Sequence, residues 1–227
     1  MSIKTWPKQE RPREKLLTKG AHYLTDAELI AIFLRTGSKK QHVLDLARNL
    51  LKQFGSLRAI LDCDSHIFQG THGIGEAKFV QLQAALELGK RYLAESLQKQ
   101  TMIENSHMTK AYLSSQLRHK KQEVFAAIFL SSSHKMLAYE ELFFGTIHSA
   151  HVHPREVVKR ALHHNAAGVI VAHNHPSGHA LPSDSDIAIT KVLKNALRLM
   201  DILLIDHIIV GDGETNSLHE MGLIPRC

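Results

Sequence analysis

Two histidines, an aspartate and a serine lie close together near residue 180. The segment HNHPSGHALPSDSD spans 173–186 and carries His173, His175 and, after ten intervening residues, Asp186. Histidines at i and i+2 on an extended segment point to the same side, so both imidazoles can reach one ion. Two imidazoles and one carboxylate make a zinc shell that leaves a fourth position for water. The segment therefore predicts a catalytic zinc site.

The same residues also have a purely structural interpretation. Ser183 stands three residues before Asp186, which is the spacing of a helix-capping pair, and the helix dipole favours an acidic first turn. His173 and His175 would then be solvated loop residues in a part of the chain that is rich in histidine. Spacing alone leaves both interpretations open.

The residues around this segment alternate between strand and helix patterns. We expect strands at 124–130, 136–144, 168–172 and 203–210, helices at 154–165 and 183–200, and a tight turn at 211–213. Pro176 and Gly178 would end the strand that carries the histidines, and Ser183 would begin the next helix. This pattern predicts a mixed α/β fold for the second part of the chain.

The first part of the chain has helical periodicity throughout. Thr25 to Glu28 form a capping-box pattern, and Gly37 is the type of residue that ends a helix. Further apolar stripes follow at 43–51, 56–61 and 78–93, whereas 96–105 has no apolar rhythm. We therefore expect a helical domain at 1–95, a linker at 96–105 and the mixed domain at 106–227.

Composition excludes several classes of protein. The 227 residues are 44% hydrophobic, but no apolar run approaches the roughly 18–20 residues of a membrane helix. The segment 1–19 is polar and basic, unlike a secretory signal. Cys63 and Cys227 are the only cysteines and form no motif, so a disulfide framework is not expected. We expect a cytoplasmic protein without a membrane partner.

Four separated segments resemble one known family. The run from His173 to Asp186 reproduces the JAMM signature H-x-H-P…S-x-x-D, and its context is similar to the bacterial RadC family. The shared segments are EELFFGT (140–146), HPREVVKRAL (153–162), AHNHPSG (172–178) and LLIDHIIVGDGE (203–214). Several motifs in one order are more specific than one motif. The resemblance implies an α-β-α JAB/MPN domain of the cytidine-deaminase-like type after a small all-α domain.

The resemblance also implies catalytic roles. JAMM chemistry needs a glutamate outside the metal shell, and the spacing to Gly145-Thr146 implies Glu140 as general base and acid. Glu141 is adjacent, but successive strand side chains face opposite ways. Ser183 is implied to stabilise an oxyanion as well as to cap its helix. The alternative for Glu140 is a surface glutamate on an edge strand.

Asp206 and His207 form a polar pair inside an apolar run. Buried polar side chains must find partners. The pair is either a support for the zinc ligands or a satisfied polar pair of the core, and the sequence leaves these two interpretations open.

The first part of the chain is also the basic part. Residues 1–100 hold 16 basic and 10 acidic residues, whereas 101–227 hold 12 of each. Residues 71–91 resemble a helix-hairpin-helix element, whose Gly73 to Gly75 turn would present backbone N–H groups to a DNA phosphate near Lys78. The alternative is a tight turn between packed helices. DNA is thus a candidate partner through Gly73, Gly75 and Lys78.

The leading hypothesis is a Zn²⁺-dependent hydrolase that cleaves a peptide, amide or isopeptide bond of a protein or peptide substrate by metal-activated water. The alternative is a DNA-associated repair or recombination accessory protein whose metal domain is structural or regulatory. A nuclease is less suited to one ion with two histidines and one carboxylate. Asn174 replaces the Ser or Thr typical of deubiquitinating JAMM enzymes, so ubiquitin-like specificity is not expected. The oligomeric state carries no prediction.

Overall fold

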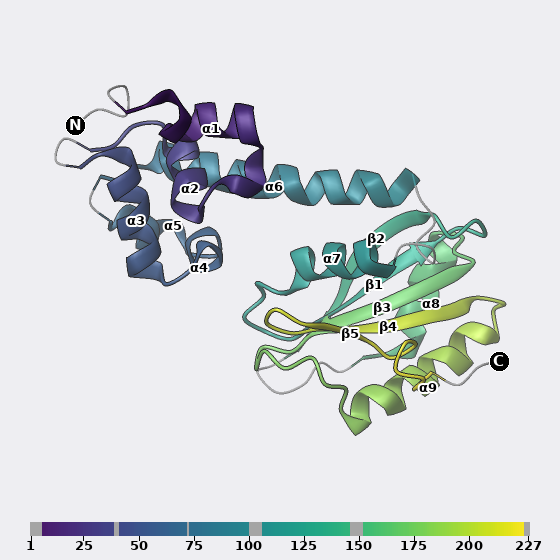
Figure 1. Ribbon diagram of the computed structural model, residues 1–227. Helices are drawn as coiled ribbons and strands as arrows, with labels where there is room; N and C mark the ends of the chain where they lie inside the picture. Colours follow the sequence, from purple (N-terminus) through teal and green to yellow (C-terminus); the bar gives the residue numbers. More distant parts are fainter. Residues whose placement is uncertain (1–5, 39–40, 72, 100–105, 146–151, 225–227) are drawn as a thin grey trace. The chain divides into compact units, whose positions relative to one another are not determined.

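The computed structural model describes residues 6–38, 41–71, 73–99, 106–145 and 152–224 (Figure 1). The chain divides into two compact units, Met1–Gly89 and Lys90–Cys227. The division falls inside helix α6 (Glu76–Lys99). This helix includes the first four residues of the predicted linker, because Leu, Gln and Lys sustain a helix without an apolar stripe. The other predicted linker residues, 100–105, lie outside the described residues.

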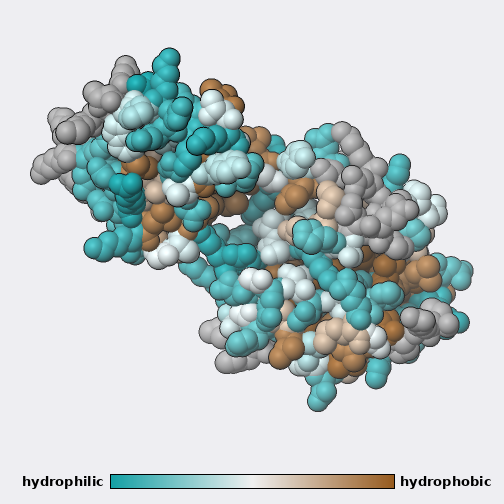
Figure 2. Space-filling view, in the orientation of Figure 1, coloured by the Kyte–Doolittle hydropathy of each residue, from teal (hydrophilic) through white to brown (hydrophobic). Residues whose placement is uncertain are grey.

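The N-terminal unit is helical, as the sequence predicted. Its helices are α1 (Pro12–Lys19), α2 (Asp26–Leu34), α3 (Val43–Phe54), α4 (Leu57–Leu61), α5 (Ser65–Gln69) and the first part of α6. Their apolar sides meet in one core built on Ile30, Leu34, Leu46, Leu50 and Phe68, all buried. Hydrophilic residues cover much of this unit's visible surface (Figure 2). The short helices α1 and α5 carry too few apolar residues for a sequence pattern to reveal them.

Helix α2 shows how the chain uses its caps. The predicted capping box is present, with Thr25 and Glu28 bonded to each other's backbone N–H. The helix ends at Leu34, and Arg35, not Gly37, adopts a positive φ of 60°. Gly37 is required for another reason, because a Cβ there would lie 2.1 Å from the carbonyl oxygen of Gln41.

The C-terminal unit is built on one mixed sheet. Its strands are β1 (Val124–Leu130), β2 (Met136–Phe144), β3 (Gly168–Asn174), β4 (Leu203–Val210) and β5 (Thr215–Ser217), in the order β2-β1-β3-β4-β5. β3 and β4 are parallel, and the other neighbours are antiparallel. The central strands β1 and β3 are buried along their whole length. The predicted mixed α/β fold is confirmed.

Helices cover both faces of this sheet (Figure 1). Helix α7 (Ser106–Leu117) packs on the face formed by Ala126, Ile128 and Ala172. Helices α8 (Pro154–His163) and α9 (Asp184–Arg198) pack on the face formed by Phe125, Ala127 and Val171. Successive residues of each strand therefore point to different helices. We call these the α7 face and the α8/α9 face.

Among the described residues, no helix is both long and apolar enough to cross a lipid bilayer.

Candidate metal centre

His173 and His175 lie where strands β3 and β4 end side by side. His173 belongs to β3, which ends at Asn174, two residues later than predicted. Its side chain is on the α8/α9 face with Phe125 and Val171. The backbone N–H of His175 donates to the Val210 carbonyl at 2.9 Å, which keeps this residue extended. The two Nε2 atoms are 2.9 Å apart. The convergence of the imidazoles is as predicted.

Asp186 comes from the first turn of α9, where Ser183 is the N-cap. The Asp186 N–H donates to Ser183 Oγ at 3.2 Å, and Asp186 Oδ2 accepts from the Ser183 N–H at 2.7 Å and from its hydroxyl at 2.6 Å. The other oxygen, Oδ1, lies 3.2 Å from His173 Nε2. Capping and metal binding are compatible, since each uses a different oxygen of Asp186.

These three side chains lie close enough together to share one ion. The distances are 2.9 Å between the two Nε2 atoms, 3.2 Å from His173 Nε2 to Asp186 Oδ1, and 3.6 Å from His175 Nε2 to Asp186 Oδ2. Ligands of a tetrahedral zinc ion with bonds of about 2.0–2.1 Å are about 3.3 Å apart. The three residues form a group that could hold a metal ion, and their donor set fits zinc.

The protonation state of Asp186 also suits a cation. Burial by itself raises the pKa of this carboxyl. Hydrogen bonds with His173, His175 and Ser183 outweigh burial and hold the pKa well below its usual range. The group is therefore an ionised carboxylate, which is the form that binds metals.

The loop after β3 fixes the orientation of His175. His175 Nδ1 donates to the His179 carbonyl oxygen at 2.8 Å, because a carbonyl can only accept. In the neutral imidazole this leaves the lone pair on Nε2. The next residue, Ala180, is held at both polar groups: its N–H donates to Glu214 at 2.8 Å, and its carbonyl accepts from Asn216 at 3.0 Å. The loop is thus tied to the turn between β4 and β5.

Two glycines permit that close approach of loop and turn. A Cβ at Gly211 would lie 2.4 Å from the Gly178 carbonyl oxygen, and Gly178 itself has a φ of 91°. The Asp212 N–H donates to the same Gly178 carbonyl at 2.7 Å. The tight turn predicted at 211–213 is therefore part of what holds the loop of the metal centre.

Asp206 and His207 resolve into two different roles. His207 is fully buried on the α8/α9 face, and its Nε2 lies 2.9 Å from His173 Nδ1. Asp206 points to the other side, where it accepts from Ser217 Oγ at 2.6 Å and from the His219 N–H at 3.0 Å. Burial raises the pKa of Asp206. His207 thus contacts a candidate metal ligand, whereas Asp206 accepts hydrogen bonds from the end of β5 and from the turn that follows it.

Glu140, the expected general base, is bound to helix α8. Its carboxylate accepts from Arg160 Nε at 2.6 Å and from Arg160 Nη2, and it contacts His164 Nε2 at 2.8 Å. The Arg160 hydrogen bonds, followed by His164, lower the pKa of Glu140 to about 2. Glu140 pairs with Ala127, which pairs with Val171. Strand spacing and rise then put its Cα about 12 Å from that of His173. The geometry does not favour Glu140 as the base.

Glu123, which the sequence reasoning missed, lies closer. It precedes β1 by one residue and, by alternation from Phe125, is on the face of His173. Since Phe125 pairs with His173, Glu123 lies opposite His175. The pKa of His175 is raised first by Asp186 and to a lesser extent by the charge on Glu123. An acidic residue at the start of the first buried strand was the signal that could have identified it.

Asn174 explains why Glu123 is held there. Its side chain points away from the metal centre, accepts from the Val124 N–H at 2.8 Å, and donates to the carbonyls of Lys120 and Gln122 at 3.2 and 3.1 Å. The residue between the two histidines thus fixes the segment that carries Glu123.

The lysine beside the glycine turn of the N-terminal unit bonds to carbonyls of its own unit. Lys78 Nζ donates to the carbonyls of Gly73 at 2.9 Å and Gly37 at 3.2 Å, and burial lowers the pKa of this amine. Gly73 has a φ of 87°, and a Cβ there would lie 2.7 Å from Ser38 Cβ. A Cβ at Gly75 would meet open space. This geometry agrees with a turn between packed helices, and DNA binding through it stays a prediction.

Comparison with known proteins gives the class of the C-terminal unit first. Residues 103–223 match the RadC-like JAB domain, and residues 3–80 match the UPF0758 N-terminal domain. The chain is therefore a JAB-domain protein with a second, N-terminal family domain.

Whole-length relatives then define the family. The UPF0758 protein of Pseudomonas syringae pv. tomato is 54% identical over 224 residues, which cover 99% of this chain and 100% of that protein. The UPF0758 protein of Nitrosococcus oceani is 56% identical over the same shares of both chains. The chain belongs to the UPF0758 family of RadC-like proteins.

Proposed function

We propose that this protein is a zinc-dependent hydrolase that cleaves an amide bond, in a peptide or an isopeptide linkage, with His173, His175 and Asp186 as the metal ligands. The observation that carries the proposal is the convergence of two Nε2 atoms, 2.9 Å apart, on one carboxylate, whose Oδ1 lies 3.2 Å from His173 Nε2 and whose Oδ2 lies 3.6 Å from His175 Nε2. Two lone pairs that face each other at this distance repel unless a cation or proton lies between them.

The chain's own residues supply proton transfer. A bound zinc ion would act as a Lewis acid and lower the pKa of its water to about 7. Glu123 accepts the proton of the attacking water and returns it to the leaving amine. This role passes to Glu123 from Glu140 because Arg160 and His164 hold the Glu140 carboxylate. Ser183 keeps its proposed role as a hydroxyl donor to the oxyanion, for which its one hydroxyl proton would turn from Asp186 Oδ2 to the substrate, while its oxygen continues to accept from the Asp186 N–H as the cap.

A pair of matched variants tests this assignment. Zinc-loaded Glu123→Gln should cleave a panel of peptide and isopeptide substrates about 10²–10⁴-fold more slowly than the wild type, with unchanged zinc content. Glu140→Gln is the control and should retain its turnover. Loss of turnover in Glu140→Gln alone would return the role to that residue. Cleavage of DNA but not of amides would replace the proposal with a nuclease.

A second candidate function is DNA association through the N-terminal unit. A cavity of about 640 Å³ lies between α1, α2 and the start of α3. Arg11, Arg13 and Arg35 line it, with Glu14 as the acidic residue among its walls. Arginines grouped beside the N-terminus of a 12-residue helix favour an anionic ligand such as a phosphate.

A further inference from the structure

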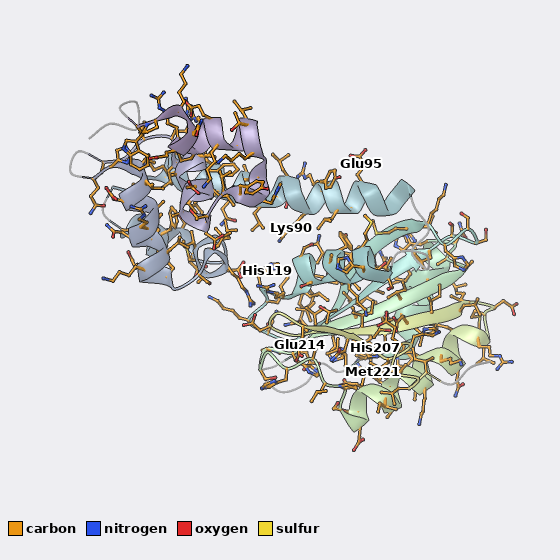
Figure 3. The ribbon with its side chains drawn as sticks, viewed as in Figure 1. Lys90, Glu95, His119, His207, Glu214 and Met221 are labelled. Atoms are coloured by element: carbon orange, nitrogen blue, oxygen red, sulfur yellow. The ribbon has the colours of Figure 1, made fainter. Side chains whose placement is uncertain are left out.

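Two buried side chains connect the proposed ligands His173 and Asp186 to each other. His207 on β4 contacts His173 Nδ1 through its Nε2 at 2.9 Å. Its other ring nitrogen, Nδ1, lies 2.5 Å from the Thr190 hydroxyl on α9. That hydroxyl in turn lies 2.5 Å from the backbone carbonyl oxygen of Asp186. Figure 3 places His207 between the sheet and α9.

The hydrogen bonds that link His173, His207, Thr190 and the Asp186 carbonyl can run in only one direction. The Asp186 carbonyl can only accept, so the one hydroxyl proton of Thr190 is directed at it. Thr190 Oγ1 therefore accepts from His207, and the proton of His207 is on Nδ1. No other arrangement satisfies both short contacts of this hydroxyl.

The same reasoning then fixes the proton of His173. His207 is 0% exposed, and its two ring nitrogens contact Thr190 and His173, so neither bonds directly to a carboxylate and the fully buried imidazole is neutral. With its proton on Nδ1, His207 Nε2 accepts, and His173 must donate from its own Nδ1. His173 is left with its lone pair on Nε2, which is the atom that faces His175 and Asp186.

We propose that Thr190 and His207 are positioning residues that lock His173 in its Nδ1–H tautomer and so reserve Nε2 for the metal ion. The proposal rests on the proposed function, in which His173 is a ligand. A histidine ligand commonly donates its second N–H to a carboxylate or a backbone carbonyl, which cannot reverse the direction of that bond. Here the acceptor is another imidazole, which could reverse it, and Thr190 removes that freedom.

The packing around Thr190 and His207 on the α8/α9 face indicates that this polar pair has a role beyond filling the core. The ring of Phe125 stacks on His173 at 6.1 Å and meets His207 edge-on at 5.6 Å. Thr190 is 1% exposed on a helix whose neighbouring buried positions are Leu193 and Leu197. Apolar residues in place of Thr190 and His207 would fit such surroundings without the cost of desolvating a hydroxyl and an imidazole. The orientation of His173 is what the polar pair supplies.

The direct test reads the tautomers in the metal-free full-length protein. Long-range ¹H–¹⁵N correlation spectra of ¹⁵N-histidine-labelled protein should show His207 and His173 both protonated on Nδ1. Thr190→Val, which removes the hydroxyl and keeps the branched shape, should weaken zinc binding about 10–100-fold, whereas Thr190→Ser should bind as the wild type does. Protonation of His207 on Nε2, or wild-type zinc affinity in Thr190→Val, would overturn the proposal.

A second pair of variants covers the case in which Thr190→Val does not fold. The amide of His207→Gln can accept from His173 and donate to Thr190, so this variant should lose less zinc affinity than His207→Leu. Equal affinities in the two variants would contradict the tautomer lock. If the wild type bound no zinc, the proposed function would fail, while the ¹⁵N spectra would still decide the tautomer.

Discussion

The metal centre of the C-terminal unit and the glycine turn of the N-terminal unit both contain polar groups of the types that bind external ligands. In the metal centre, the second nitrogen of each histidine and one oxygen of Asp186 are held by protein partners, and the remaining atoms face one another. In the glycine turn, Lys78 donates to two carbonyls of its own unit. The difference is that the metal centre leaves polar atoms available for a ligand, whereas the amine of Lys78 is already occupied by its own unit.

The largest effect expected at the metal centre, beyond its ligands and Glu123, is that of Ser183. Ser183→Ala should lower turnover per bound zinc about 10²–10³-fold if the hydroxyl serves the oxyanion. The cap itself contributes about 1 kcal/mol of stability. Ser56→Ala is a matched control, because Ser56 caps α4 through the Ala59 N–H at 3.1 Å. Equal losses of turnover and zinc content in Ser183→Ala would leave capping as its only role.

Glu140 provides a smaller effect, which appears as a dependence of stability on pH. Its folded pKa of about 2 lies below the value of 4.5 for an unperturbed glutamate. The stabilisation is therefore complete above about pH 4.5 and is lost as pH falls towards 2. Glu140→Gln should lower the free energy of unfolding by about 1–2 kcal/mol at pH 7, and this difference should shrink on acidification. A difference that is the same at pH 3 and pH 7 would contradict the ion pair.

The fold and the grouping of His173, His175 and Asp186 could be predicted from the sequence because both follow from local patterns. Short apolar, β-rich runs marked β1, β3 and β4, and the spacing of His173, His175 and Asp186 matched a strand end followed by a capped helix. The positions of Glu140 and Glu123 depend on strand pairing instead. Glu140 is two strands away from β3, and Glu123 reaches the centre only because β1 lies beside β3. Spacing along one strand carries no information about that pairing.

His207 and Lys78 illustrate the same limit in opposite ways. The sequence left open whether His207 supports the candidate ligands, and its contact with His173, 34 residues away along the chain, favours that interpretation. Lys78 matched a phosphate-binding pattern, but its amine donates to the carbonyl of Gly37, 41 residues away along the chain. Long-range hydrogen bonds of this kind have no local sequence signature.

The smallest effect expected is in DNA retention by the N-terminal unit. Lys78→Met leaves two carbonyls unpaired and should lower the free energy of unfolding by about 1–3 kcal/mol without weakening DNA binding at low salt. Arg13→Gln, in the arginine-lined cavity, should weaken binding and reduce its salt dependence. Fluorescence anisotropy with a labelled duplex at two salt concentrations measures both. Weaker binding in Lys78→Met with unchanged stability would assign the phosphate contact to the glycine turn.

Metal analysis of three purified full-length proteins tests the central claim most directly. After equilibration with zinc and removal of the free ion, the wild type should retain one zinc ion per chain and His173→Ala none. His179→Ala is the control, because it keeps the backbone carbonyl that accepts from His175, and it should retain zinc. A wild-type protein without zinc, or a His173→Ala protein that holds as much zinc as the wild type, would contradict the assignment of the metal centre.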